Sequence, residues 1–361
     1  MWNNTRATKI LGAQYPILQG PFGGKVSTVQ LAATVSNAGG IGGYGAYTLT
    51  PQEIYTVDAE LKKATNKPYN INLWISDTDT TNSASQSDLQ KVTALFQPYF
   101  DALGIAPPSM PPSFTSRFEN QIEVILDTRP PVFSFVFGIP SADILAKCKQ
   151  LGIVTVGAAT TLDEALALEA AGVDIIAASG FEAGGHRPSF LASSETSLNS
   201  TFVLLQQIKE KVRTPVIAAG GIATGKGIAA ALALGADAVQ IGTAFLACDE
   251  SNIPDIHRER LFSDDAKYTT LTRAYTGRLG RGLRNKITEE TRGQEQNLLP
   301  FPLQSQFMSA LRKAAIEQKR WEFLYLWSGQ IAPILKHKKA AELMQSLIDE
   351  TTDYFQTIKQ S

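Results

Sequence analysis

Residues 174–187 of the chain read DIIAASGFEAGGHR. The first six residues, 174–179, are almost all apolar, which is typical of a strand that is buried on both faces of a parallel sheet. The remaining residues are rich in glycine and include His186, one of only three histidines in the protein. A glycine-rich segment with a histidine at the end of a buried strand suggests an active site. The same residues are also compatible with an ordinary turn that carries a surface imidazole.

The chemistry of this loop favours an anionic ligand. Glycine lacks a Cβ atom, so its backbone can adopt positive φ and bring N–H groups close to an anion such as a phosphate. His186 is the only side chain in the loop that titrates near neutral pH. Arg187 adds a fixed positive charge next to it.

Seven other short apolar runs have the same character and alternate with segments of helical period. Together with residues 174–179 they predict eight strands: 16–20, 40–45, 69–74, 132–138, 153–158, 174–179, 215–219 and 238–241. Apolar residues at helical spacing predict helices at 27–37, 141–151, 201–212 and 224–234. The alternation predicts an α/β fold, a (β/α)8 TIM barrel.

Two further helix starts follow from capping signals. Thr50 with Glu53, and Thr161 with Glu164, each match a capping box. Pro51 occupies the first helical position, where its missing N–H group costs nothing.

The ligand site of a TIM barrel lies at the carboxyl ends of its strands, and phosphate sites often use the loops after strands seven and eight. Strand one leads into residues 20–24, GPFGG, strand seven into Gly220 and Gly221, and strand eight into Gly242 and Thr243. These positions predict a phosphate site. Tight turns between strands and helices also need glycine, so the turn alone is the competing interpretation.

The length of 361 residues fits one barrel of about 250 residues with an appended segment. We expect the barrel at 1–248, with an insertion at about 76–131 after strand three. That insertion either covers the barrel mouth or is a solvated excursion with a helix or two. We expect 249–361 to be a mostly helical C-terminal segment, with helices at 308–327 and 340–359, that packs on the barrel mouth.

Composition excludes several classes of protein. With 43% hydrophobic residues, 19% charged residues and a formal charge of −1, the chain shows no sign of a nucleic-acid surface or a disordered tail. Cys148 and Cys248 are far apart and lack metal or redox spacing, so we expect buried thiols and no metal site. The N-terminus carries no signal-like segment and no run is long enough to span a membrane, which predicts a cytoplasmic protein. His257 and His337, in the polar tail, are expected to be solvated.

Ten motifs together resemble the nitronate monooxygenase family, formerly called 2-nitropropane dioxygenase, over nearly the whole chain. Seven lie in the barrel: PILQGPFGG (16–24), NAGGIGG (37–43), NINL (70–73), FVFGIP (135–140), GFEAGGHR (180–187), AAGGIAT (218–224) and QIGTAFL (240–246). Three lie in the tail: TRAYTGR (272–278), LPFPLQ (299–304) and LWSGQ (326–330).

This resemblance implies an FMN-dependent barrel that oxidises alkyl nitronates, such as propionate 3-nitronate, with molecular oxygen and without a metal or nicotinamide. It implies that His186 faces the substrate and assists its binding or proton abstraction. Pro21 and Phe22 would run along the flavin ring, Asn72 would bond the ring edge, and Gln240 would contact the ring or ribityl chain. The full set of implied cofactor residues is Pro21, Phe22, Gly23, Asn72, Gly180, Gly184, Gly185, Gly220, Gly221, Gln240, Gly242 and Thr243.

Two alternatives stay open at this point. The Gly-Gly-His loop and the two-glycine phosphate sites also occur in the related flavin-dependent enoyl-acyl carrier protein reductases, which take electrons from NADH. A flavin-binding barrel without turnover, acting as a sensor or partner protein, is the third interpretation. FMN is favoured over FAD because the chain has no dinucleotide fingerprint with a distal acidic residue. Both a monomer and a homodimer fit the sequence.

Overall fold

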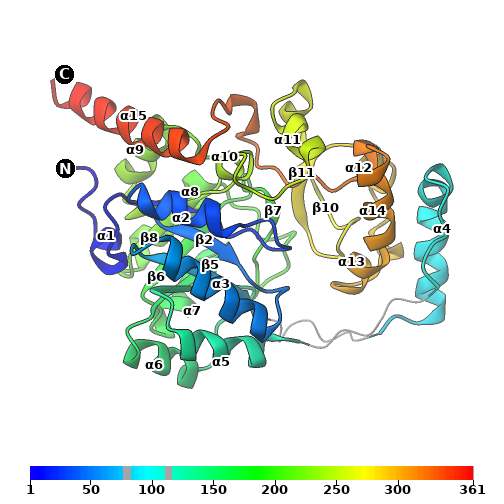
Figure 1. Ribbon diagram of the computed structural model, residues 1–361, viewed down its shortest axis with the longest axis horizontal. Coiled ribbons are helices and arrows are strands. Elements are labelled where there is room, and N and C mark those ends of the chain that lie inside the picture. The colour runs from blue at the N-terminus through cyan, green and yellow to red at the C-terminus, as the bar shows by residue number, and fades with distance from the viewer. Residues whose placement is uncertain (76–82, 110–115, 361) are drawn as a thin grey trace.

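The computed structural model describes residues 1–75, 83–109 and 116–360. Its centre is an eight-stranded parallel sheet that curls into a barrel (Figure 1). All eight predicted strands are confirmed, each within two residues of its predicted ends. They are β1 (Ile17–Gln19), β2 (Gly42–Gly45), β3 (Tyr69–Trp74), β4 (Val132–Val136), β5 (Val154–Ala159), β6 (Ile175–Ser179), β8 (Val216–Ala219) and β9 (Ala238–Ile241).

The strand order closes the barrel. The hydrogen-bonded order runs β1-β9-β8-β6-β5-β4-β3-β2, and a parallel bridge between Leu18 and Ile41 brings β1 next to the segment that leads into β2. The interior is filled by apolar side chains of the strands. At one end, Ala7 and Leu11 of α1 (Arg6–Leu11) join this interior cluster. The barrel is therefore a packed core and leaves its carboxyl end for a ligand.

Helices cover the outside of the barrel, and the four that periodicity predicted are confirmed within two residues at each end. The helices in the barrel repeat are α2 (Val29–Asn37), α3 (Pro51–Ala64), α5 (Phe118–Thr128), α6 (Ala142–Gln150), α7 (Leu162–Ala170), α8 (Thr201–Lys211) and α9 (Gly225–Ala233). Directly after β9, where the eighth barrel helix would be expected, the chain forms the short α10 (Thr243–Leu246). The last helix, α15 (Ala340–Gln360), packs against α9 and α2 (Figure 1). It thus occupies the eighth helical place, whereas we expected the whole of 249–361 over the barrel mouth.

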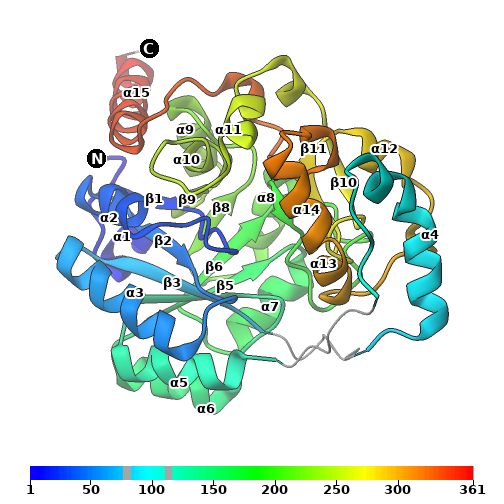
Figure 2. The same ribbon diagram turned by 45° about the vertical axis from the view of Figure 1, so that its right-hand side comes forward.

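A second hydrophobic core lies beside the mouth of the barrel. It joins α4 (Gln86–Ala102), from the insertion, to elements of the C-terminal segment, and Figure 2 shows α4 beside α14. The C-terminal elements are α11 (Asp255–Leu261), η1 (Asp264–Lys267), β10 (Thr269–Thr272), β11 (Gly280–Leu283), α12 (Lys286–Glu290), η2 (Glu295–Asn297), α13 (Leu303–Phe307), α14 (Ser309–Glu317), η3 (Trp321–Phe323) and η4 (Ala332–Ile334).

A small antiparallel sheet in this region was not predicted. β10 pairs with β11, and β11 pairs with the two-residue strand β7 (Gly185–His186). The segment that we expected to be a loop after strand six is therefore fixed to the C-terminal segment by backbone hydrogen bonds. Its pairing partner lies almost a hundred residues later, so no local pattern reveals it.

Two local expectations need correction. The insertion is shorter than predicted, because α5 packs against α3 as an ordinary barrel helix; parts of it, 76–82 and 110–115, lie outside the described residues. The helix predicted at 308–327 ends at Glu317, and Trp327 instead forms a bridge with Gly282.

Of the two predicted capping boxes, one forms completely and the other forms only in part. Thr50 and Glu53 form the reciprocal box. Thr161 accepts the Glu164 N–H, but the Glu164 carboxylate accepts bonds from Thr160 and the backbone of Phe190 instead of closing the box.

Both cysteines are free and buried, as predicted. Among the described residues, no helix has both the length and the apolar character needed to cross a membrane. Within the same residues, no group of three or more His, Cys, Asp or Glu side chains is arranged to hold a metal ion.

Candidate active site

A cavity of about 340 Å³ opens at the carboxyl end of the barrel, and residues 324–329 of the C-terminal segment form part of its wall. This volume is in the range of small-molecule sites. The structure brings nearly all of the predicted site residues to it. Those that line the cavity are Pro21, Phe22, Gly23, Asn72, Gly184, Gly185, His186, Gly220, Gly221, Gln240, Gly242 and Thr243.

Gly180 is the one predicted site residue that does not line the cavity. A Cβ atom at this position would collide with the backbone and hydroxyl of Thr201, at the start of α8. The close approach of α8 therefore explains this glycine by packing alone.

The structural reason for glycine differs between the turn after β8 and the turn after β9. Gly220 and Gly221 have φ of +112° and +69°, so the turn itself favours glycine there. Gly242 has φ of −96°, and a Cβ atom added to it would meet nothing closer than the Phe22 ring at 4.0 Å. Neither backbone conformation nor protein packing accounts for Gly242. The space beside this residue is open.

Polar groups of the barrel retain hydrogen-bonding capacity toward the cavity. Asn72 is buried within β3 and donates one Nδ2 hydrogen bond to Ser134 at 2.9 Å, which leaves a second N–H of the same amide. Thr243, at the start of α10, accepts a bond from the Gly329 N–H at 2.9 Å. Its own hydroxyl proton is available for another acceptor.

His186 is held in one orientation by two elements. Its backbone belongs to β7, opposite Gly280 of β11, and its Nε2 lies 2.8 Å from Oγ1 of Thr276. That hydroxyl is also within 3.2 Å of the Arg278 carbonyl oxygen, to which it can donate, and it accepts the Arg278 N–H at 3.3 Å. When Thr276 donates to the carbonyl, the His186 proton is on Nε2 and Nδ1 is left as an acceptor.

Aromatic rings surround the imidazole. The centroids of Trp327, Trp74 and Phe301 lie 5.0, 5.4 and 6.0 Å from that of His186, and Trp74 stacks on Tyr47 at 3.6 Å. Burial among these rings, together with the positive charge of Arg278, lowers the pKa of His186 to about 3. The imidazole is therefore neutral at physiological pH and can accept a proton, but it does not supply a positive charge.

Arg187 does not add a charge to the cavity, contrary to the expectation from its position. It is 1% exposed, and its guanidinium donates to the carbonyl oxygens of Gly180, Ser179 and Ser197. Burial lowers its pKa to about 10. Arg187 thus stabilises the conformation of the loop after β6 through these buried hydrogen bonds.

The prediction that His257 is solvated was also wrong. This histidine is buried and lines the cavity. Its Nε2 donates to the Trp327 carbonyl oxygen at 3.0 Å, an assignment that follows from the acceptor being a carbonyl. Burial lowers its pKa to about 4, while the hydrogen bond to Trp327 opposes that shift. His337 is only partly exposed.

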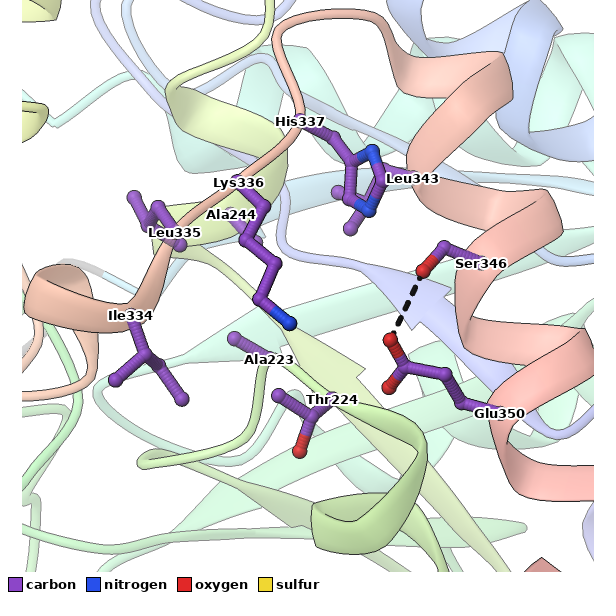
Figure 3. Close-up of a pocket in the computed structure, with 10 residues that line it drawn as sticks. All are labelled: Ala223, Thr224, Ala244, Ile334, Leu335, Lys336, His337, Leu343, Ser346 and Glu350. Carbon is purple, nitrogen blue, oxygen red and sulfur yellow. Dashed lines mark hydrogen bonds between the residues drawn. The ribbon is translucent and has the colours of Figure 1, made fainter.

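A second, much smaller hollow of about 10 Å³ lies between the loop before α9 and helix α15, and Lys336, His337 and Glu350 line it (Figure 3). Glu350 accepts the Gly225 N–H at 2.9 Å, at the first turn of α9. The N-terminus of α9 is therefore already occupied by a carboxylate of the protein.

Comparison with known proteins identifies the family. The family model described as nitronate monooxygenase matches residues 4–350. The chain belongs to the nitronate monooxygenase family. It is therefore a flavoprotein oxidoreductase with a TIM-barrel fold.

Relatives cover the full length of this family member. A probable nitronate monooxygenase of Staphylococcus aureus is 35% identical over 357 residues, which is 99% of each chain. The structure of a nitroalkane oxidase from Streptomyces ansochromogenes is similar with a TM-score of 0.87 and 34% identity, covering 98% of this chain and 99% of that one. FabK from Thermotoga maritima is similar with a TM-score of 0.75 and 26% identity, covering 99% of both chains.

Sequence reasoning missed several cavity residues of this nitronate monooxygenase family member. Thr276 and Trp327 belong to the tail motifs TRAYTGR and LWSGQ, whose distance along the chain from His186 concealed their role. Tyr47 follows β2 and Trp74 is the last residue of β3, so both lie at the carboxyl ends of barrel strands, and that position was the available signal. Arg312 lies on an amphipathic helix and shows no distinguishing pattern.

Proposed function

We propose that this protein binds FMN at the barrel mouth and oxidises alkyl nitronates with molecular oxygen. The observation that carries the proposal is the position of the His186 imidazole, among aromatic rings in a cavity that is also lined by the glycine turns after β8 and β9. A nitronate is already deprotonated at carbon, so its oxidation needs an electron acceptor and a positioned anion rather than a strong base.

The residues at the cavity fit FMN. The open space beside Gly242 admits a phosphate close to the backbone, and the Thr243 hydroxyl retains a donor for it. The spare N–H of Asn72 and the carboxamide of Gln240 would hold polar atoms of the ring or ribityl chain. FMN, when bound, supplies the electron-accepting chemistry and the reaction with oxygen, which no side chain of the cavity can provide.

His186 and its neighbours would orient the substrate. Depending on which way the Thr276 proton points, His186 offers the cavity either an acceptor nitrogen or an N–H donor for a nitro oxygen. With an acceptor nitrogen it can also remove a proton from a neutral nitroalkane. Tyr47, Trp74 and Trp327 form apolar walls that exclude water from the reacting carbon.

Oxygen uptake tests this proposal. The FMN-loaded protein should consume oxygen with propionate 3-nitronate or propyl-1-nitronate and should not accelerate NADH consumption with a short enoyl thioester. NADH-dependent reduction of the thioester, without oxygen uptake on nitronates, would instead support the enoyl reductase interpretation. Inactivity in both assays would leave a flavin-binding protein without turnover.

A further inference from the structure

Arg312, on α14, lines the same cavity as His186 but belongs to the C-terminal core. Its guanidinium carbon lies 4.9 Å from the centroid of the Tyr325 ring. Tyr325 contacts Trp327, with centroids 5.3 Å apart, and Trp327 contacts His186 at 5.0 Å. A continuous series of rings thus connects Arg312 to the candidate catalytic histidine.

In the part of the chain that the structure describes, no carboxylate oxygen lies within 4.0 Å of the Arg312 guanidinium, and its side chain makes no hydrogen bond. By contrast, Arg258, near the same wall, donates to the carbonyl oxygens of Cys248 and Ser251. A guanidinium has five N–H donors, remains charged and normally meets an acceptor in a folded protein.

The rest of the cavity wall carries no formal charge. Among the described lining residues, Arg312 is the only Asp, Glu, Lys or Arg side chain. The two lining histidines have pKa values lowered by burial to about 3 for His186 and about 4 for His257, with Arg312 one of the charges that depress the latter. Burial raises the pKa of Tyr47, which remains a neutral phenol. Arg278 also acts on His186 but does not line the cavity, so Arg312 is the fixed cation that the described wall presents to a ligand, and it favours an anion.

We propose that Arg312 is a specificity-determining residue that binds a carboxylate on the substrate, at the end away from the nitronate. This inference rests on the proposed function and narrows it to nitronates that carry a carboxylate. The planar guanidinium matches a carboxylate with two parallel hydrogen bonds, and stacking on Tyr325 limits the conformations that must be frozen on binding. An unsubstituted alkyl nitronate would use the same cavity without this contact.

Binding of succinate tests the subsite without any turnover. Succinate has the shape and two negative ends of propionate 3-nitronate, but it lacks the nitronate that is oxidised. Calorimetric titration would compare the FMN-loaded wild type with Arg312→Gln, Arg312→Lys and Lys313→Gln. Lys313 is the exposed neighbour on the same helix and serves as the matched control.

The expected result is a roughly ten- to hundredfold loss of succinate affinity in Arg312→Gln, because a charge-assisted hydrogen bond is removed. The succinate affinity of Arg312→Lys should lie between those of the wild type and Arg312→Gln, because lysine keeps the charge and loses the planar pair of donors. Lys313→Gln should bind as the wild type does. In oxygen uptake, Arg312→Gln should raise KM for propionate 3-nitronate by a similar factor and leave propyl-1-nitronate unchanged.

Two outcomes would overturn the proposal. One is equal succinate affinity in the wild type and Arg312→Gln, including no binding by either. The other is loss of FMN from folded Arg312→Gln, which would assign the arginine to the cofactor phosphate. If no nitronate is oxidised while succinate binding still depends on Arg312, the anion subsite stands and the proposed function fails.

Discussion

Nε2 of His186 lies 2.8 Å from Oγ1 of Thr276, which is 90 residues later in the chain. This contact joins the glycine-rich segment of the barrel to the TRAYTGR segment of the tail, and the pairing of β7 with β11 fixes both at the cavity. The segment after β6 therefore supplies the histidine, and the tail supplies the hydroxyl that orients its ring.

Replacement of His186 by Asn should reduce turnover without unfolding the protein. Asn retains a hydrogen-bond donor but does not titrate, so we expect turnover to fall about a hundredfold or more. The loss should be larger for neutral nitroalkanes than for nitronates, because only the former require removal of a proton. Flavin content and thermal midpoint should match those of the control His337→Asn. Wild-type turnover of nitronates by His186→Asn would remove this residue from the mechanism.

Thr276 should act as a positioning residue for His186. Thr276→Val keeps the shape of the side chain and removes its hydroxyl, so the imidazole loses its hydrogen-bond partner at Nε2. We expect kcat/KM to fall roughly tenfold or more, as is typical when a group that orients a functional histidine is lost. Thr276→Ser should restore most of the activity because the hydroxyl returns. Equal loss in Ser and Val would indicate that packing, rather than the hydroxyl, is responsible.

Gly242 should determine cofactor affinity. Gly242→Ala places a methyl group in open space beside the proposed phosphate, and the resulting overlap should weaken FMN binding by roughly 5- to 150-fold, the equivalent of about 1–3 kcal/mol. Gly227→Ala is a suitable control, because the added Cβ atom meets nothing closer than 3.4 Å and the residue does not line the cavity. Equilibrium dialysis of FMN against each apoprotein measures the effect. Unchanged affinity in Gly242→Ala would place the phosphate elsewhere.

Burial of His257 should make stability fall in acid. Its pKa is about 4 in the folded protein against an ordinary value of 6.5, so below pH 6.5 the unfolded chain binds a proton that the folded chain does not. The free energy of unfolding should therefore be constant above pH 6.5 on this account. It should fall by about 1.4 kcal/mol per pH unit between pH 6.5 and 4.

Urea unfolding at pH 7.5 and pH 5.0, with FMN in excess, measures this dependence. His257→Gln can keep the donor to Trp327 without the titration, so its loss of stability between the two pH values should be smaller by about 2 kcal/mol. The same loss in the variant and the wild type would mean that His257 is accessible to protons in the folded state.

The barrel and the place of its cavity could be predicted because their signals are local. Strands buried on both faces have a distinctive composition, and glycines after β1, β8 and β9 mark the edge where the ligand site opens. These signals indicated Gly220, Gly221, Gly242 and His186, and the family resemblance supplied the rest of the twelve predicted residues that line the cavity, such as Asn72 and Gln240.

The remainder of the site depends on contacts between distant segments. The two-residue strand β7 is stabilised only by β11, and its sequence has no periodicity of its own. His257 is flanked by Ile256 and Arg258, which made a surface position the ordinary expectation. Its acceptor, the Trp327 carbonyl, is 70 residues away, and only the folded chain shows that the imidazole is buried and satisfied.

Anaerobic mixing tests the central claim that a nitronate, rather than NADH, delivers electrons to the cofactor in this cavity. FMN-loaded protein is mixed without oxygen with propionate 3-nitronate, and separately with NADH, while the visible absorbance of the oxidised flavin is followed. We predict that the nitronate removes this absorbance within the time of a turnover and that NADH leaves it unchanged. Rapid loss of the absorbance with NADH, and none with the nitronate, would contradict the account.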